Sequence, residues 1–428
     1  MSETTSRANF IACTGVALTG AVAFATGVRA PAIARNAKIT YWSPLDPKAS
    51  DARARGEAAM IDIFHKRHPD ITVEVQPVPW QTMGQQLLLA VNAGEGPDVA
   101  QLSSTNLPDQ IAAGTVAPLD DMVGKTWKKK DRDDFILPWD NTVYNGRKMA
   151  YYWNTLLNNE LWYLKDIGGT PPDNWTKFAL WLQSHSKSGM SGFLTGLSEN
   201  GNAIELTDWL IPAFWASGAE YVTASGDIGF DNDNGAKPFE WLLSLVNKYK
   251  VTPSSITSLT RDNVLDAVKQ RKTMTTLLTS NILGSVQTAL HGELALAMQP
   301  GPNGPAPAFA TGKYLVMTKT SKEREAAGLF IESLISHDAQ LANAKIAKEL
   351  PCLKSVGRDP YFDTPEGSNQ RFALEYIQKH PHPYKYSMHT DYLQTQLALA
   401  AQQMMSGTPV RKALHDVAEK WEAQRGKQ

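Results

Sequence analysis

The 428 residues of this chain are too many for one ordinary domain, and 42% of them are hydrophobic while 20% are charged, a balance that supports buried cores and excludes a disordered chain. The formal net charge of -1 provides no long-range field toward nucleic acid or an anionic membrane, so neither is expected as a partner. Only two cysteines occur, Cys13 and Cys352, which excludes a disulfide framework and any zinc or redox spacing.

Residues 1–34 have the pattern of a secretory signal peptide. Residues 10–28 are apolar or small and carry no charge, arginines flank them, and the small residues of 30–34 suit a signal peptidase cutting near 34–37. A membrane anchor of the same length is the alternative, but the many Ala, Gly and Thr residues make the stretch weakly hydrophobic and favour the signal. Ala8 stands where a twin-arginine motif needs its second arginine, so the export route stays open. We expect a periplasmic mature chain.

The mature chain begins with alternating strand and helix patterns. Residues 38–42 are typical of a short buried strand, residues 71–75 alternate between apolar and polar side chains, and residues 97–102 are predicted as the third strand. Helical periodicity separates them, with one apolar stripe over residues 54–64 and a second helix over residues 82–92. This alternation predicts a parallel α/β sheet.

The later part of the chain is richer in helices. The helical patterns between residues 155 and 290 cover 175–184, 206–217, 238–250 and 264–269. A strand follows at residues 312–317, then a helix from Ser321, and the last helix covers residues 410–421. The Pro- and Gly-rich residues 300–305 predict a crossing between domains.

No catalytic motif, dinucleotide loop or phosphate-binding loop is present. His380 and His382, with His389 nearby, are the best metal candidates, but the interleaved prolines favour an ordinary surface loop. The adjacent carboxylates of Asp120 and Asp121 are typical of a solvated stretch rather than a glycosidase pair, which needs two carboxyl groups across a cleft. We therefore expect no catalytic residue, no metal and no cofactor.

Five segments together carry a family resemblance. They are Ala-Gly-Glu-Gly-Pro-Asp-Val at 93–99, the Tyr-rich run at 144–154, the paired prolines and tryptophan at 171–175, the strand and helix at 312–335, and Leu-Pro-Cys-Leu-Lys-Ser at 350–355. In this order and spacing, the chain resembles the extracellular solute-binding proteins of ABC importers, in the large carbohydrate-binding class that includes maltose-binding protein. The resemblance covers essentially all of the mature chain.

This resemblance implies two α/β lobes, each a mainly parallel sheet flanked by helices, joined by crossing hinge strands. Lobe one is expected at 38–150 plus 301–348, and lobe two at 151–300 plus 349–428. The implied function is to capture a mono- or oligosaccharide, or a related polyol, by hinge closure and to deliver it to ABC permease subunits in the membrane. We expect a monomer.

The ligand site is expected just after the strands, because ligands of open α/β sheets lie beyond the carboxyl ends of strands. Sugars stack their C–H faces on aromatic rings and pair their hydroxyls with donors and acceptors. These criteria select Trp42, Ser43, Trp80, Gln81, Gln101, Ser103, Ser104, Tyr152, Trp153, Asn154, Trp215, Asn281 and Tyr314. Apolar spacing instead assigns to the cores Trp162, Trp181, Trp241 and Trp421.

Two other functions stay open at this point. A secreted carbohydrate-active enzyme would need a carboxylate pair across the cleft. A sensor subunit that presents its ligand to a membrane receptor would share the fold and the site. Arg147 and Arg358 also keep a sugar acid or a phosphorylated polyol open as the ligand.

Overall fold

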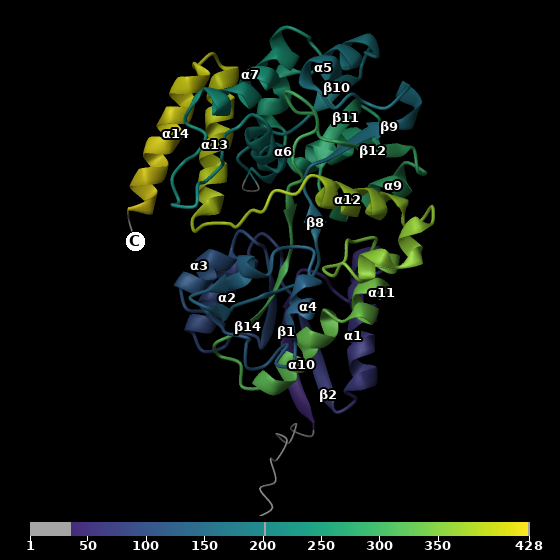
Figure 1. Ribbon diagram of the computed structural model, residues 1–428, viewed down its shortest axis with the longest axis vertical. Helices are drawn as coiled ribbons and strands as arrows, with labels where there is room; N and C mark the ends of the chain where they lie inside the picture. Colours follow the sequence, from purple (N-terminus) through teal and green to yellow (C-terminus); the bar gives the residue numbers. More distant parts are fainter. Residues whose placement is uncertain (1–35, 201–202, 427–428) are drawn as a thin grey trace, which may run out of the picture.

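Two halves lie one above the other in the computed structural model, which describes residues 36–200 and 203–426 (Figure 1). Each half has its own large hydrophobic core. The predicted signal peptide, residues 1–34, lies outside the described residues. Among the residues that are described, no helix combines the length and the apolar character needed to cross a bilayer.

A six-stranded sheet forms the centre of the first half, in the order β2-β1-β3-β14-β4 with β7 paired to β14. Strands β1, β2 and β3 are parallel, as the alternating patterns predicted. Strand β14 is antiparallel to β3, because the chain re-enters this sheet from the second half. The bounds are Ala37–Ser43 (β1), Ile71–Pro77 (β2), Val99–Leu102 (β3), Val116–Ala117 (β4), Tyr151–Tyr152 (β7) and Tyr314–Thr318 (β14).

Helices of the first half come from two distant parts of the chain. They are α1 (Ala52–Arg67), α2 (Met83–Asn92), α3 (Leu107–Ala112), α4 (Lys129–Asp133), α10 (Arg324–Leu334) and α11 (His337–Ala347). Phe330 of α10 packs against both Phe64 of α1 and Tyr41 of β1, with each pair of ring centroids 5.1 Å apart. Gly56 allows α1 to approach α11 closely, since a Cβ atom at Gly56 would lie 2.8 Å from that of Ala347.

The second half contains a four-stranded sheet in the order β10-β11-β9-β12. This sheet is mixed rather than mainly parallel: β10 and β11 are parallel, whereas β9 is antiparallel to both β11 and β12. Strand β9 enters directly from the first half, which sets its direction against the strands that follow. The bounds are Glu160–Leu164 (β9), Ser191–Leu194 (β10), Thr273–Leu278 (β11) and Leu294–Met298 (β12).

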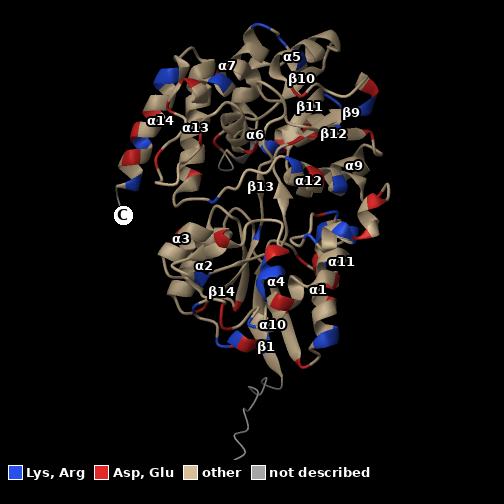
Figure 2. Ribbon diagram, viewed as in Figure 1, with Lys and Arg blue, Asp and Glu red and all other residues tan. Residues whose placement is uncertain are grey.

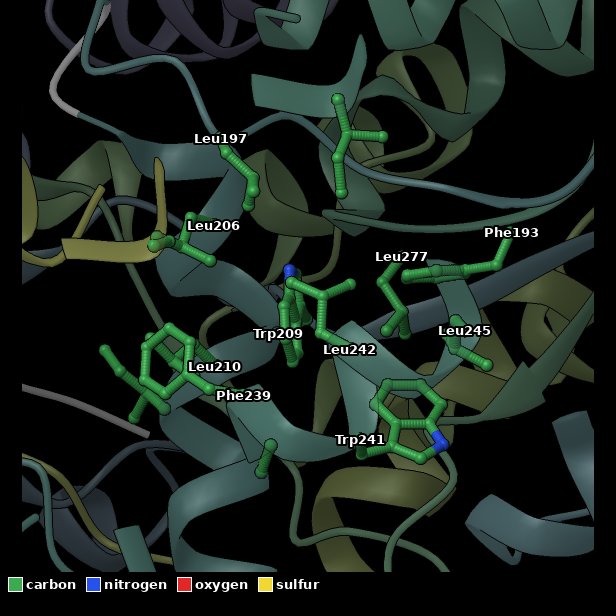
Figure 3. Packing of buried hydrophobic residues seen from close by; sticks show 14 of the residues in the cluster. Phe193, Leu197, Leu206, Trp209, Leu210, Phe239, Trp241, Leu242, Leu245 and Leu277 are labelled. Atoms are coloured by element: carbon green, nitrogen blue, oxygen red, sulfur yellow. The ribbon is translucent and has the colours of Figure 1, made fainter. Parts of the chain in front are cut away.

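Helices surround this second sheet and close its core. They are α5 (Trp175–Ser184), α6 (Ile204–Ala216), α7 (Asp233–Asn247), α8 (Arg261–Lys269), α9 (Leu283–Ala289), α12 (Ser368–Lys379), α13 (Thr390–Met405) and α14 (Val410–Arg425). Figure 3 shows Trp209 of α6 and Trp241 of α7 among leucines from several elements. The core assignment of Trp162, Trp241 and Trp421 is confirmed by their burial, and Trp181 packs partly buried against the same core.

Short elements complete the chain. The two-residue strands are Val143–Tyr144 (β5), Arg147–Lys148 (β6), Leu156–Leu157 (β8) and Ala310–Thr311 (β13). The 3-10 turns are Trp139–Thr142 (η1), Lys165–Ile167 (η2), Ser254–Ser258 (η3), Ser280–Ile282 (η4), Val356–Arg358 (η5) and Pro360–Asp363 (η6). Cys352 has a free thiol and is buried in the way that a small hydrophobic residue would be.

Strands β8 and β13 pair antiparallel between the two halves. The segment 300–305, where the crossing was expected, instead lies on the second half: the Gly301 N–H donates to the carbonyl oxygens of Asp173 and Gly304. The crossing comes later, at β13. The lobe limits implied by the resemblance stay a prediction, and we propose that the hinge lies at the β8–β13 ribbon.

Candidate functional site

A cleft of about 1400 Å³ separates the two halves. Its first wall comes from the segments after β1, β2 and β3 and from the start of α2. Its second wall comes from the loop before α6, the start of α8, η4 and the start of α13. Leu156, Asn158 and Thr311, on or beside the β8–β13 ribbon, line the cleft as well. Because residues of both halves line the space, relative movement of the halves would change its shape.

Five of the residues selected from the sequence line this cleft: Trp80, Gln81, Ser103, Ser104 and Asn281. The first four follow β2 and β3 in the first half, and Asn281 lies in η4 after β11 in the second half. These five side chains lie beyond strand ends and come from both walls, as the rule for ligand sites in open α/β sheets predicts. Trp80 is only partly buried, so part of its indole surface faces solvent in the cleft.

Three further candidates lie within the core of the first half instead of the cleft. The rings of Tyr152 and Tyr314 pack 5.3 Å apart, and the Tyr152 hydroxyl donates to the Pro138 carbonyl oxygen at 2.7 Å. Trp153 is fully buried. These residues lie on or beside β7 and β14, where side chains point at the faces of the sheet, and helices and loops cover those faces.

Ser43 and Gln101 are also buried, because both bind the carboxylate of Glu57 on α1. The Ser43 hydroxyl donates to Glu57 at 2.8 Å, and Gln101 Nε2 donates to it at 2.5 Å. Trp42 precedes Ser43 in β1 and so points to the opposite face of the sheet, where its Nε1 donates to Gln76 Oε1 at 2.8 Å. None of the three lines the cleft, because each lies within a strand rather than beyond its end.

The last two candidates stabilise neighbouring segments. Trp215 stacks on His382, with ring centroids 4.0 Å apart and an interplanar angle of 9°. Asn154 is buried and donates from Nδ2 to Glu349 at 2.9 Å. His382 is thus held by an aromatic ring, and the described residues contain no group of three His, Cys, Asp or Glu side chains placed to hold a metal ion.

The cleft also contains charged and polar residues that sequence reasoning missed. They include Arg53, Asn106, Asp109, Asp208, Arg261, Lys313, Tyr386, Asp391 and Gln394. Most come from helix starts or from the segment between α12 and α13, where no strand end marks them. For Arg53, Asp208 and Arg261 the available signal was a position just before or within the first turn of a predicted helix, which is common to many surface residues. Helices α3 and α13, which carry or border four of the others, were not predicted from the sequence.

Glu349 connects helix α1 to two segments that run between the halves. It accepts from Asn154 beside β8 at 2.9 Å, from Lys313 after β13 at 3.3 Å, and from Arg53 of α1 at 2.9 Å. Although burial raises the pKa of a carboxyl group, Lys313 and Arg53 lower that of Glu349 to about 2. We call these four residues the Glu349 hub. Its two cations line the cleft while its carboxylate lies behind them.

A second ion pair lies on the opposite wall, between Arg261 at the start of α8 and Asp208 of α6. Burial raises the pKa of Asp208 to about 6, even though Arg261 opposes the shift. Each cation that lines the cleft in the described part of the chain therefore has a carboxylate partner.

The Glu57 carboxyl group predicts a specific pH dependence of stability. Burial raises its pKa from 4.5 to about 7, although Ser43 and Tyr41 donate to it. The folded state thus holds this proton more tightly than the unfolded state, and the resulting stability is full below pH 4.5 and is lost as pH rises through 7. Between pH 5 and 8, Glu57 is expected to lower the wild-type free energy of unfolding by a value on the order of 3 kcal/mol. In Glu57→Gln this pH-dependent loss should be absent.

Urea unfolding of the wild type and of Glu57→Gln at intervals from pH 5 to 8 measures this difference. Other buried acids, such as Glu160 with its pKa raised by burial to about 8, contribute equally to both proteins and cancel in the comparison. Parallel pH profiles for the two proteins would show that Glu57 titrates normally.

Comparison with known proteins identifies relatives of this architecture. The family described as bacterial extracellular solute-binding protein matches residues 43–341. A binding protein of Brucella abortus (strain 2308) is 24% identical over 304 residues, which cover 70% of this chain and 73% of the relative.

Solved structures resemble most of the chain, across both halves. Maltose-bound MalE3 of T. maritima is 22% identical, with a TM-score of 0.75 over 91% of this chain and 100% of that chain. The GacH receptor of Streptomyces glaucescens is 19% identical, with a TM-score of 0.75 over 91% of this chain and 98% of that chain. These matches confirm the two-lobed fold. With the family match over most of the sequence, they lead to one conclusion: the chain belongs to the bacterial extracellular solute-binding proteins.

Proposed function

We propose that this protein is the periplasmic sugar-binding component of an ABC importer, which closes around a mono- or oligosaccharide and delivers it to permease subunits in the membrane. The observation that carries this proposal is the cleft itself: one wall presents the partly exposed Trp80, and both walls present amide, hydroxyl and carboxylate groups. An aromatic face and a dense set of hydrogen-bonding groups are what a sugar requires.

The ligands of similar proteins support a sugar. The T. maritima neighbour holds maltose, the Streptomyces glaucescens receptor binds acarbose, and a Bdellovibrio bacteriovorus protein of this fold binds maltotriose. The volume of about 1400 Å³ exceeds that of ordinary drug-sized pockets, which leaves room for more than one sugar ring or for closure of the lobes.

The charges of the cleft favour an uncharged ligand. Arg53 and Lys313 share the Glu349 carboxylate, and Arg261 pairs with Asp208. Arg147 instead binds Asp120 at 2.8 Å, and neither Arg147 nor Arg358 lines the cleft. A sugar acid or a phosphorylated polyol would therefore compete with carboxylates already in place, whereas hydroxyl groups can bind beside them.

Closure follows from contact with both walls. A sugar that touches Trp80 on one wall and the region of Asn281 on the other binds the closed state better, and this differential affinity shifts the population toward closure. In this proposal the protein acts as a monomer, performs no chemistry on the sugar and binds no nucleic acid. Figure 2 supports the last point, since basic and acidic residues are interspersed over both halves.

A thermal-shift screen against neutral mono- and oligosaccharides, polyols, sugar acids and sugar phosphates tests the proposal. A neutral sugar is expected to raise the melting temperature, because a ligand at a hundred times its Kd stabilises the folded state by about 2.7 kcal/mol. The sugar recovered after incubation should be unchanged. No shift with any carbohydrate, or conversion of the sugar to a product, would overturn the proposal.

A further inference from the structure

A second cavity, of about 450 Å³, lies against the other face of the β8–β13 ribbon. Paired residues of an antiparallel ribbon point to the same side, and neighbours along a strand point to opposite sides. The pair Leu156 and Thr311 lines the cleft. In the adjacent pair, Ala310 lines the second cavity, and Leu157 is buried in a small apolar cluster with Ala308. The ribbon thus separates the two spaces.

The interior of the second cavity is mainly apolar and is built from both halves. Ile136 and Pro138 approach from the first half, where the preceding Phe135 and the following Leu137 are part of the core. Leu374 and Ile377 approach from α12, which packs against β12 of the second half. This volume and this lining are typical of sites for small organic molecules.

Basic side chains form the rim of this cavity. Lys354, Arg358 and Arg371 line it together with one acid, Glu375, which pairs with Lys379 at 2.7 Å. The Arg358 side chain is 70% exposed, and its nearest carboxylate oxygen, on Asp134, is 3.8 Å away. Arg371 binds Asp363 at 2.7 Å and the Gly357 carbonyl oxygen at 3.3 Å, and adds positive charge at the rim. The exposed Arg358 therefore supplies the rim's free capacity to bind an anion.

We propose that this cavity binds a small amphipathic carboxylate, with its apolar chain between α12 and the ribbon and its head group at Arg358 and Arg371. The apolar walls exclude a sugar, and the basic rim selects a carboxylate over a neutral alcohol of the same length. The site is distinct from the cleft, since the two linings have no residue in common.

Occupancy of this cavity opposes closure of the cleft, an inference that rests on the proposed function. Rotation about the ribbon that narrows the cleft widens the space on the other face and separates the carboxylate from one of its walls. A carboxylate that fits the cavity as the structure has it therefore binds a more closed form less well, and by linkage a sugar in the cleft weakens carboxylate binding by the same factor.

Calorimetry with sodium octanoate in the absence of sugar tests the site itself. We expect octanoate to bind wild-type protein, n-octanol to bind at least tenfold more weakly, and Arg358→Glu to weaken octanoate at least tenfold. Leu374→Trp, which fills the cavity, should abolish binding, while Lys420→Glu on the exposed face of α14 should leave it unchanged. Circular dichroism checks the folding of each variant. Absence of octanoate binding, or equal binding by Arg358→Glu and wild type, would overturn the site.

Titration of the sugar identified in the screen, with and without saturating octanoate, tests the coupling. The sugar Kd should rise at least threefold, and the octanoate Kd should rise by the same factor in saturating sugar. Independent affinities would overturn the coupling. The two proposals fail separately: octanoate binding without any sugar binding contradicts the proposed function and leaves the second site in place.

Discussion

Replacement of Glu349 by leucine is expected to lower the free energy of unfolding by about 3–5 kcal/mol, the cost of removing one partner from a buried ion pair. The substitution leaves the Lys313 ammonium, which is 5% exposed, without a carboxylate, and it removes the acceptor for Asn154 and Arg53. Urea unfolding followed by tryptophan fluorescence measures the loss.

Two further variants distinguish the loss of the contacts in the Glu349 hub from the loss of an acidic side chain in general. Glu366→Leu, at an exposed position, should change stability by no more than about 0.5 kcal/mol. The double variant Lys313→Met with Glu349→Leu should recover part of the loss, because it removes the unpaired charge along with its partner. A loss below about 1 kcal/mol for Glu349→Leu would show that the hub does not hold the crossing segments together.

Replacement of Trp80 by alanine is expected to raise the sugar Kd by about tenfold to a hundredfold. This range corresponds to about 1.4–2.8 kcal/mol, as expected when a large aromatic contact is lost. Trp80 is the tryptophan that lines the cleft among the described residues, and Lys313 Nζ lies 5.8 Å from its ring centroid. Calorimetry with the sugar found in the screen measures the change.

The matched control is Trp42→Ala. Trp42 also follows the strand-end pattern in the sequence, but its indole binds Gln76 outside the cleft. We expect the sugar Kd of this variant to stay within about twofold of wild type, since no cleft contact is lost. Equal losses in the two variants would contradict the placement of the site.

The fold could be predicted from local patterns because they reflect the packing directly. The alternation of apolar and polar residues at 71–75 corresponds to β2, and the helix predicted at 175–184 coincides with α5. The mixed second sheet could not be predicted in this way, because strand direction depends on where the chain re-enters the sheet. The shift of the crossing from 300–305 to β13 depends in the same way on distant contacts, such as that between Gly301 and Asp173.

The candidate site was predicted only where the position of a residue after a strand end is enough to place it in the cleft. Trp80 and Ser103 follow strands and reach the cleft. Ser43 and Gln101 satisfy the same pattern, but Glu57 on α1 binds both and keeps them in the core. The presence of a buried carboxylate behind a strand cannot be read from the residues of that strand. Nor can the meeting of Arg53, Lys313 and Glu349, which lie far apart in the sequence.

Small-angle X-ray scattering with and without the sugar tests the central claim most directly, since it measures whether the two halves move together when the cleft is filled. The radius of gyration should fall as the sugar saturates the protein, and the fall should follow the binding isotherm measured by calorimetry. A radius of gyration that stays constant at full occupancy would contradict capture by closure of the two lobes.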